Sequence, residues 1–153
     1  MQLFLIAAKS RVAPLKSKLS IPRLELLAAT IGARLCNSLK VDLGQDVDMY
    51  FWSDSTTVLT WIQKYEEWAT FVGNRIKEIR CLTETEAWRH VPGSMNPADL
   101  SSQGCSPKQL FESRWWEGPA WLCASPSNWP QEQPIYNEKE IYEERKKGVE
   151  LRC

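Results

Sequence analysis

Strand-like and helix-like segments alternate over residues 2–104, and this alternation limits the possible folds more than any other feature of the sequence. Short runs rich in apolar and β-branched residues predict strands, whereas apolar residues at helical spacing predict helices. The predicted strands cover 2–13, 47–52 and 87–91, and the predicted helices begin near residues 22, 56, 66 and 97. This order is typical of an α/β domain, in which helices pack on a sheet.

The predicted helices carry recognisable start signals. Pro22 suits a first helical turn, Ser55 is a suitable N-cap, and Asn96 followed by Pro97 combines a cap with a proline. The first helix also has apolar residues at helical spacing, typical of a packed face. These residues are Leu24, Leu27, Ala28, Ile31 and Leu35.

Three acidic residues coincide with the ends of these predicted elements. Glu25 lies near the start of the first helix, Asp54 directly follows the strand at 47–52, and Asp99 falls in the first turn of the last helix. Carboxylate oxygens are the ligands that hard divalent cations prefer, so their convergence would create a metal site. Each acid also has a structural interpretation, since Glu25 and Asp99 favour helix starts and Asp54 suits a turn.

Charge and cysteine content restrict the kinds of partner. Nineteen basic residues balance nineteen acidic ones, so nucleic-acid binding would require a local patch or a shaped groove. Five dispersed cysteines without a Cys-x-x-Cys pair, and a single histidine, His90, argue against structural zinc and favour reduced thiols in an intracellular, cytoplasmic or nuclear protein. The apolar start of the chain is too short to span a membrane and lacks the basic residues of a signal peptide, so no membrane partner is expected.

The predicted organisation has three parts. Residues 1–104 form the domain, 105–124 a Trp-rich packed extension, and 125–153 a Pro-rich and charged linker or tail. The eight tryptophans are expected to be packing residues, with stacking on bases as the alternative. For the charged end at 138–152, a solvated connector is favoured over a frayed helix.

Six ordered strings resemble the ribonuclease H-like domain of BEL/Pao-type LTR retrotransposon polyproteins, N-terminally truncated. The resemblance extends from about residue 6 to Leu122. The strings are AKSRVAPLK (8–16), IPRLELLAA (21–29), FWSDS (51–55), FVGNRI (71–76), WRHVPG (88–93) and NPADL (96–100).

The resemblance implies a fold and a reaction. The fold is a ribonuclease H-like mixed sheet with flanking helices, here lacking the family's first two strands. The reaction is hydrolysis of the RNA strand in an RNA·DNA hybrid, with two Mg²⁺ (or Mn²⁺) ions held by four carboxylates. Glu25, Asp54 and Asp99 resemble three of these catalytic, metal-binding residues. The fourth, an aspartate on the first strand, has no counterpart, because the first aspartate in the sequence is Asp42.

Further predictions concern contacts with the nucleic acid and the partners of the chain. Lys9, Arg11, Asn74, Arg75 and Lys77 are candidates for contacts with the hybrid, although exposed basic residues are usually only solvated. His90 is interpreted as a packed or edge histidine; Ser94 stands about where many relatives have a histidine, and Gln103 where they have an arginine. A reverse transcriptase upstream and an integrase downstream would be the polyprotein partners.

Three hypotheses about function stay open, and the last of them is an untranslated or unstable fragment with no function of its own. The first is a hybrid-specific endonuclease, impaired because the first-strand aspartate is absent. The second is an inactive remnant that acts as a nucleic-acid-binding or protein-interaction module.

Overall fold

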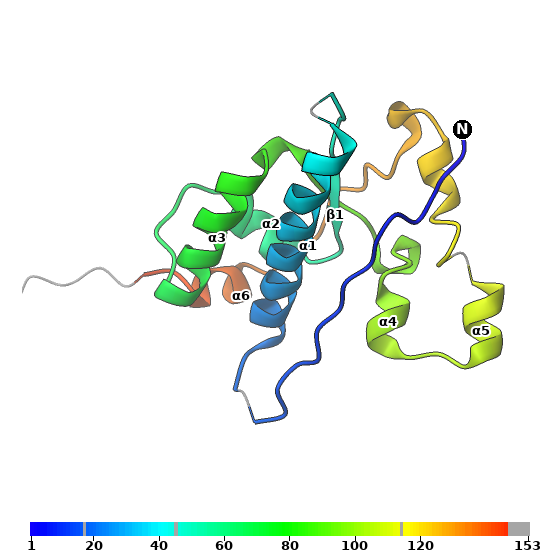
Figure 1. Ribbon diagram of the computed structural model, residues 1–153. Coiled ribbons are helices and arrows are strands. Elements are labelled where there is room, and N and C mark those ends of the chain that lie inside the picture. Colours follow the sequence, from blue (N-terminus) through cyan, green and yellow to red (C-terminus); the bar gives the residue numbers. More distant parts are fainter. Residues whose placement is uncertain (17, 45, 114, 147–153) are drawn as a thin grey trace, which may run out of the picture.

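The computed structural model describes residues 1–16, 18–44, 46–113 and 115–146 of the 153-residue chain. Within these ranges, helices dominate and the strands are short (Figure 1). The α-helices are α1 (Ile21–Leu43), α2 (Thr56–Gln63), α3 (Thr70–Leu82), α4 (Asp99–Gln103), α5 (Pro107–Glu112) and α6 (Glu138–Glu143). The strands are β1 (Phe51–Ser53) and β2 (Trp88–His90), and the 3-10 helices are η1 (Thr85–Ala87), η2 (Gly93–Met95), η3 (Ala120–Cys123) and η4 (Pro126–Asn128).

The two strands form a parallel sheet, with Phe51 opposite Trp88 and Ser53 opposite His90. The ladder continues past β2, where the Val91 N–H donates to the Ser53 carbonyl at 3.0 Å. Parallel strands require a crossover connection. Helices α2 and α3 provide it, and α1 packs against both of them.

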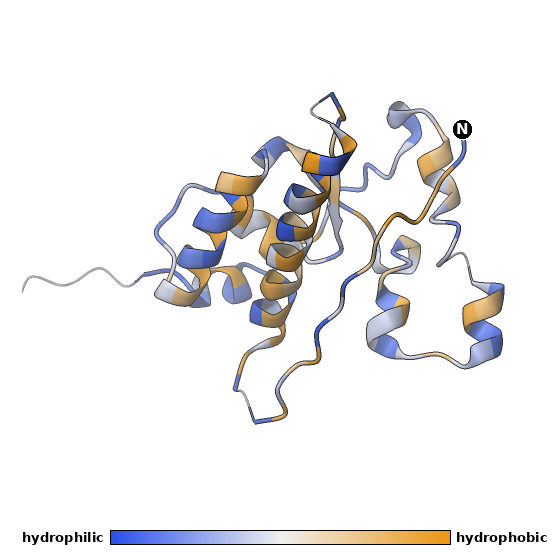
Figure 2. Cartoon of the chain, viewed as in Figure 1, coloured by the Kyte–Doolittle hydropathy of each residue, from blue (hydrophilic) through white to orange (hydrophobic). Residues whose placement is uncertain are grey.

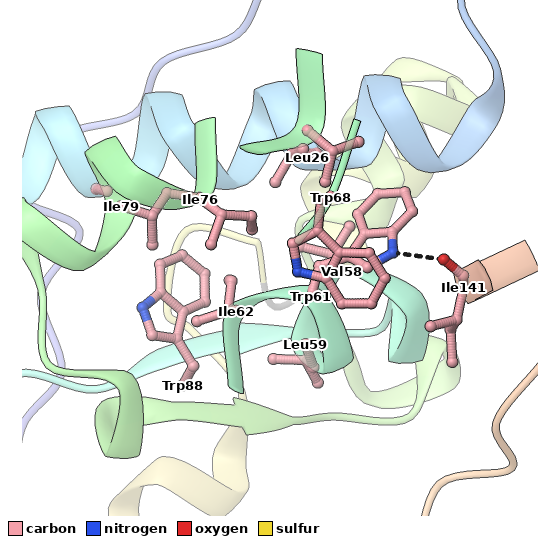
Figure 3. Close-up of a cluster of buried hydrophobic side chains, with 12 residues drawn as sticks. Leu26, Val58, Leu59, Trp61, Ile62, Trp68, Ile76, Ile79, Trp88 and Ile141 are labelled. Atoms are coloured by element: carbon pink, nitrogen blue, oxygen red, sulfur yellow. Dashed lines mark hydrogen bonds between the residues drawn. The ribbon is translucent and has the colours of Figure 1, made fainter. Parts of the chain in front are cut away.

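The core lies between these helices and the sheet (Figure 3). Helices α1, α2, α3 and α6 and strand β2 contribute apolar side chains that are almost completely buried. Burial of one such side chain stabilises the fold by roughly 1.5–3 kcal/mol. The core residues are Leu26, Ala33, Val58, Leu59, Trp61, Ile62, Trp68, Val72, Ile76, Ile79, Trp88 and Ile141.

Two of the three helix start signals agree with the structure, whereas α4 begins at Asp99 and has Ala98, not Asn96, at its N-cap. The first helix begins beside Pro22, as predicted, and the Ser55 hydroxyl caps α2 by accepting from the Val58 N–H at 3.3 Å. The predicted packing stripe of α1 is displaced, however. The buried residues of α1 are Leu26, Thr30 and Ala33, and none of them belongs to the predicted stripe. Helix α1 packs on the crossover helices α2 and α3.

The predicted strand at 2–13 is absent, and this expectation was wrong for the structure. No backbone hydrogen bond holds the described residues 1–16 in a ladder, and Phe4 and Val12 are 77% and 90% exposed. Figure 2 shows a hydrophobic stretch in this segment, which runs apart from the three-helix core. A strand forms only when a neighbouring strand accepts its backbone groups, and among the described residues neither β1 nor β2 does so.

Two predicted elements are shorter than expected. The strand at 47–52 is reduced to β1, and the helix expected from Glu66 begins at Thr70. Residues before α3 pair instead with the end of the chain, because the Ala69 N–H donates to the Glu144 carbonyl at 2.6 Å and Lys146 N–H donates to the Glu67 carbonyl at 2.8 Å. Tertiary pairing therefore overrides the helical pattern at 66–69.

The charged end of the chain is packed where it was expected to be solvated. Ile141 of α6 is 2% exposed, and its carbonyl accepts a hydrogen bond from Trp61 Nε1 at 3.0 Å (Figure 3). Residues 138–143 are therefore helical, as in the alternative interpretation, and are not a solvated connector. The remainder of the expected connector, 147–153, lies outside the described residues.

Tryptophans of the Trp-rich extension and of the segment after it pack against Trp52 of β1. Trp121 and Trp129 meet the Trp52 ring edge-on at centroid distances of 4.7 and 5.7 Å. Arg89 of β2 lies over the Tyr50 and Trp129 rings, at 4.7 and 5.5 Å, so cation–π contacts add to this packing. The three-part division of the chain stays a prediction.

The architecture is mixed helix and strand with a small parallel sheet, which is compatible with a ribonuclease H-like α/β fold. The predicted absence of the family's first two strands stays a prediction. No helix in the described ranges combines the length and the apolar character needed to cross a membrane.

Candidate metal and nucleic-acid site

The three predicted carboxylates come from three elements that meet at one end of the sheet. Asp54 directly follows β1, Asp99 is the first residue of α4, and Glu25 lies one turn into α1. The chain between β2 and α4 turns at η2, which brings Asp99 back toward the end of β1. The crossover topology therefore places the three carboxylates at the same end of the sheet.

Asp54 and Asp99 form a close pair beside Gly93. A Cβ placed on Gly93 would lie 3.4 Å from Asp99 Oδ2 and 3.6 Å from Asp54 Oδ2. Desolvation raises the pKa of Asp99, and the charge of Asp54 and a hydrogen bond with it raise it further. Two carboxyl groups held this close repel each other when both are ionised, so a cation between them would be favoured.

Glu25 is close to this pair but is held by a different partner. Its Oε2 accepts a hydrogen bond from the Ser55 hydroxyl at 2.5 Å. Burial is the largest cause that raises the Glu25 pKa; the Ser55 bond opposes it, and the charges of Asp54, Glu140 and Asp99 add to it. One hydroxyl, that of Ser55, therefore caps α2 and orients Glu25.

The donor set fits a divalent cation only in part. The carboxylates of Asp54 and Asp99 are hard oxygen ligands of the type that Mg²⁺ and Mn²⁺ prefer. Yet the described residues contain no group of three Asp, Glu, His or Cys side chains arranged to hold one ion. The pair is thus suited to a cation, whereas Glu25 would first have to leave Ser55.

The predicted nucleic-acid residues lie in two separate places. Asn74 and Lys77 are exposed on α3, where the Arg75 guanidinium lies 4.9 Å from the Phe71 ring centroid. Lys9 and Arg11 are exposed in the N-terminal segment, and Figure 1 places that segment and α3 on opposite sides of α1. The five residues therefore do not form one patch, and their role stays a prediction.

His90 lies within β2 beside Ser53, in agreement with a packed or edge position. Its Nδ1 is buried and has no hydrogen-bond partner among the described residues. Its place in the ladder between β1 and β2 fits a structural role.

Sequence reasoning missed three contributors to the site. Gly93 leaves the space between the two aspartates, and Ser55 holds Glu25. Glu140 of α6 accepts from the Thr57 hydroxyl at 2.5 Å and adds negative charge near Glu25. The Pro-Gly turn and the serine cap were visible signals for the first two, whereas nothing in the sequence connects Glu140 with residues 83 positions earlier.

The small parallel sheet and its flanking helices are compatible with the ribonuclease H-like class. Residues 1–55 match the family model of the Pao retrotransposon-like RNaseH-like domain. The predicted resemblance to this family is therefore confirmed, over a segment that includes Glu25 and Asp54 and ends before Asp99. No curated protein and no solved structure matches the chain.

Proposed function

We propose that the chain is the ribonuclease H-like domain of a retrotransposon-derived polyprotein and hydrolyses the RNA strand of RNA·DNA hybrids. The pairing of Asp54 with Asp99 beside Gly93 carries this proposal. It joins an acid inside the segment that matches the family with an acid well outside it. Two ionised carboxylates this close repel each other and destabilise the fold. Such destabilising pairs are found at functional sites, where a bound metal ion compensates their charge.

Asp54 and Asp99 would hold a Mg²⁺ or Mn²⁺ ion, with Glu25 as the third ligand and two ions in the complete family site. Bound ions supply an activated water and stabilise the leaving oxygen. The hydrogen bond from Ser55 holds Glu25 beside the pair, and Glu25 would leave this bond to bind the ion. Gly93 keeps the approach to both aspartates free of a side chain.

Activity of these 153 residues alone is expected to be impaired. The sequence contains no aspartate before Asp42, so the first-strand carboxylate is not among them. Fewer carboxylates compensate the charge of two adjacent dications less well. The reverse transcriptase upstream and the integrase downstream are the proposed polyprotein partners.

Incubation of the chain with an RNA·DNA hybrid and Mg²⁺ or Mn²⁺ tests the proposal. We expect slow cleavage of the RNA strand only, abolished by Asp54→Asn. Asp48→Asn is the matched control, because Asp48 is an exposed aspartate before β1 and its substitution should not affect cleavage. Equal cleavage by wild type and Asp54→Asn, or none by a folded wild-type chain, would overturn the proposal.

A second candidate is a module that binds nucleic acid without hydrolysing it. The lack of an aspartate before Asp42 in the sequence favours it, because the first-strand ligand then has no counterpart. In that case hybrid binding persists in Asp54→Asn and is weakened by the double substitution of Arg75 and Lys77 to Ala. Unchanged binding in the double variant would count against α3 as the contact surface.

A further inference from the structure

An open cavity of about 480 Å³ lies next to the acidic pair, in the size range of small-molecule sites. Gly93 and Asp99 form the side that it shares with the pair, and Trp115 from the extension after α5 belongs to its lining. The cavity therefore connects the candidate metal site with the Trp-rich extension. Its position raises the question of which part of a substrate would enter it.

Several polar groups of the cavity have unused hydrogen-bonding capacity. Asn96 uses its Oδ1 to accept from the Ala98 N–H at 3.2 Å, which leaves its amide N–H groups free to donate. The side chains of Ser94 and Gln103 make no hydrogen bond with the described residues. Ser113, by contrast, is committed, because its hydroxyl donates to the Leu110 carbonyl and accepts from the Trp115 N–H.

Trp115 supplies an aromatic surface to the cavity. Trp116 meets its ring edge-on at 4.8 Å, with an interplanar angle of 80°, which restricts how the Trp115 ring can turn. Trp116 itself is 56% exposed and is not part of the described lining. The two neighbouring rings thus have different surroundings and can be tested against each other.

Charge indicates what the cavity would bind. Asp99 is the only charged residue among the described residues that line it, and its carboxylate would repel a free anion. A flat, neutral group with polar edges fits better, because it can stack on an indole and exchange hydrogen bonds with side-chain amides. Unpaired nucleobases have these properties, whereas a base inside a duplex is already stacked and paired.

We propose that this cavity holds one unpaired RNA base next to the bond that is cleaved, stacked on Trp115 and hydrogen-bonded by Asn96 and Gln103. The inference rests on the proposed function, since it needs a nucleic-acid strand at Asp54 and Asp99. It adds a preference for hybrids with a single-stranded RNA end over blunt hybrids.

Binding to three labelled hybrids tests the inference, with Ca²⁺ present as the hard cation. One hybrid is blunt, one has a single-nucleotide RNA overhang, and one has the same overhang without its base. Wild type should bind the overhang with its base most tightly, and Trp115→Ala should reduce that affinity by about 5- to 150-fold, the range for loss of one stacked base. Binding to the other two hybrids should not change.

Controls separate stacking from folding. Trp115→Phe should keep most of the preference, and Trp116→Ala all of it, while thermal melting reports whether each variant is folded. Equal affinity for the overhangs with and without a base, or no effect of Trp115→Ala on a folded chain, overturns the base pocket. If the chain cleaves hybrids but shows no preference for the overhang, only the base pocket is rejected. If it shows a Trp115-dependent preference but no cleavage, only the proposed hydrolase activity is rejected.

Discussion

Arg23 and Glu144, 121 positions apart, form a bidentate ion pair between α1 and the residue that follows α6, with N···O distances of 2.6 and 2.9 Å. Beside it, the Glu144 carbonyl accepts the Ala69 N–H at the start of α3. One residue near the end of the described chain therefore joins α1 and α3. The segment around α6 is thus part of the folded core and not an appendage.

Ile141→Ala should destabilise the fold by about 2–5 kcal/mol, because the side chain is buried among core residues and a cavity would remain. Urea unfolding measures the loss. Ile135→Ala is the matched control, since Ile135 is 93% exposed and should change the free energy of unfolding very little. Similar effects of the two substitutions would contradict the packed position of α6.

Glu144→Gln should lower the free energy of unfolding by about 1 kcal/mol, because a charge-assisted pair is replaced by a weaker bond at a partly buried position. Glu143→Gln, at an exposed neighbouring position, provides the comparison. The same urea series serves both variants. Removal of Arg23 together with Glu144 should cost less than the sum of the single losses.

Local signals predicted the starts of α1 and α2 well. Pro22 and Ser55 act through their own backbone and the next few residues, so the sequence contains the whole cause. The strand expected at 2–13 and the packing of Ile141 depend instead on distant partners. A run of apolar or charged residues does not show whether such a partner exists, and for this reason both expectations differed from the structure.

The candidate site shows the same division. Local patterns placed Asp54 after a strand and Asp99 in the first turn of a helix, and the structure has both carboxylates beside Gly93. The engagement of Glu25 with Ser55 depends on a side-chain rotamer, and the approach of Glu140 depends on α6. Neither can be derived from spacing along the chain.

The Arg34–Glu78 pair predicts how stability changes in acid. A bidentate contact at 2.5 and 3.0 Å links α1 to α3, and hydrogen bonding by Arg34 lowers the Glu78 pKa below its ordinary value. Its contribution is therefore complete above the ordinary glutamate pKa and is lost as the pH falls through the lowered value. Glu78→Gln should reduce the difference in stability between neutral and acidic pH, measured by urea unfolding.

Glu84→Gln is the control for this series, because Glu84 is exposed and no ion pair is recorded for its side chain among the described residues. High salt should also reduce the difference, since the pair is exposed. If the two glutamine variants had identical pH profiles, the Arg34–Glu78 contact would have no energetic role.

Gly93→Ala should separate folding from cation binding. The new methyl group would meet Asp99 Oδ2 and Asp54 Oδ2 at ordinary contact distances of 3.4 and 3.6 Å, so the fold should tolerate it. It would nevertheless occupy the space between the carboxylates, and the rise in melting temperature on adding Mg²⁺ should decrease. Gly32→Ala, where a Cβ meets nothing within 4 Å in the middle of α1, should retain the Mg²⁺ response and add stability of up to about 1 kcal/mol.

Asp99→Asn should change the free energy of unfolding in opposite directions with and without Mg²⁺. In EDTA the substitution removes one of two facing negative charges, so the free energy of unfolding should rise by a modest amount, within about 1 kcal/mol. With saturating Mg²⁺ the wild-type chain should gain stability by mass action, because only the folded state brings the two carboxylates together, and the variant should gain much less. Urea unfolding of both chains, with Asp48→Asn as the exposed comparison, gives the four free energies needed. A variant that gained as much from Mg²⁺ as the wild type would show that Asp99 is not a ligand, whatever its effect on cleavage.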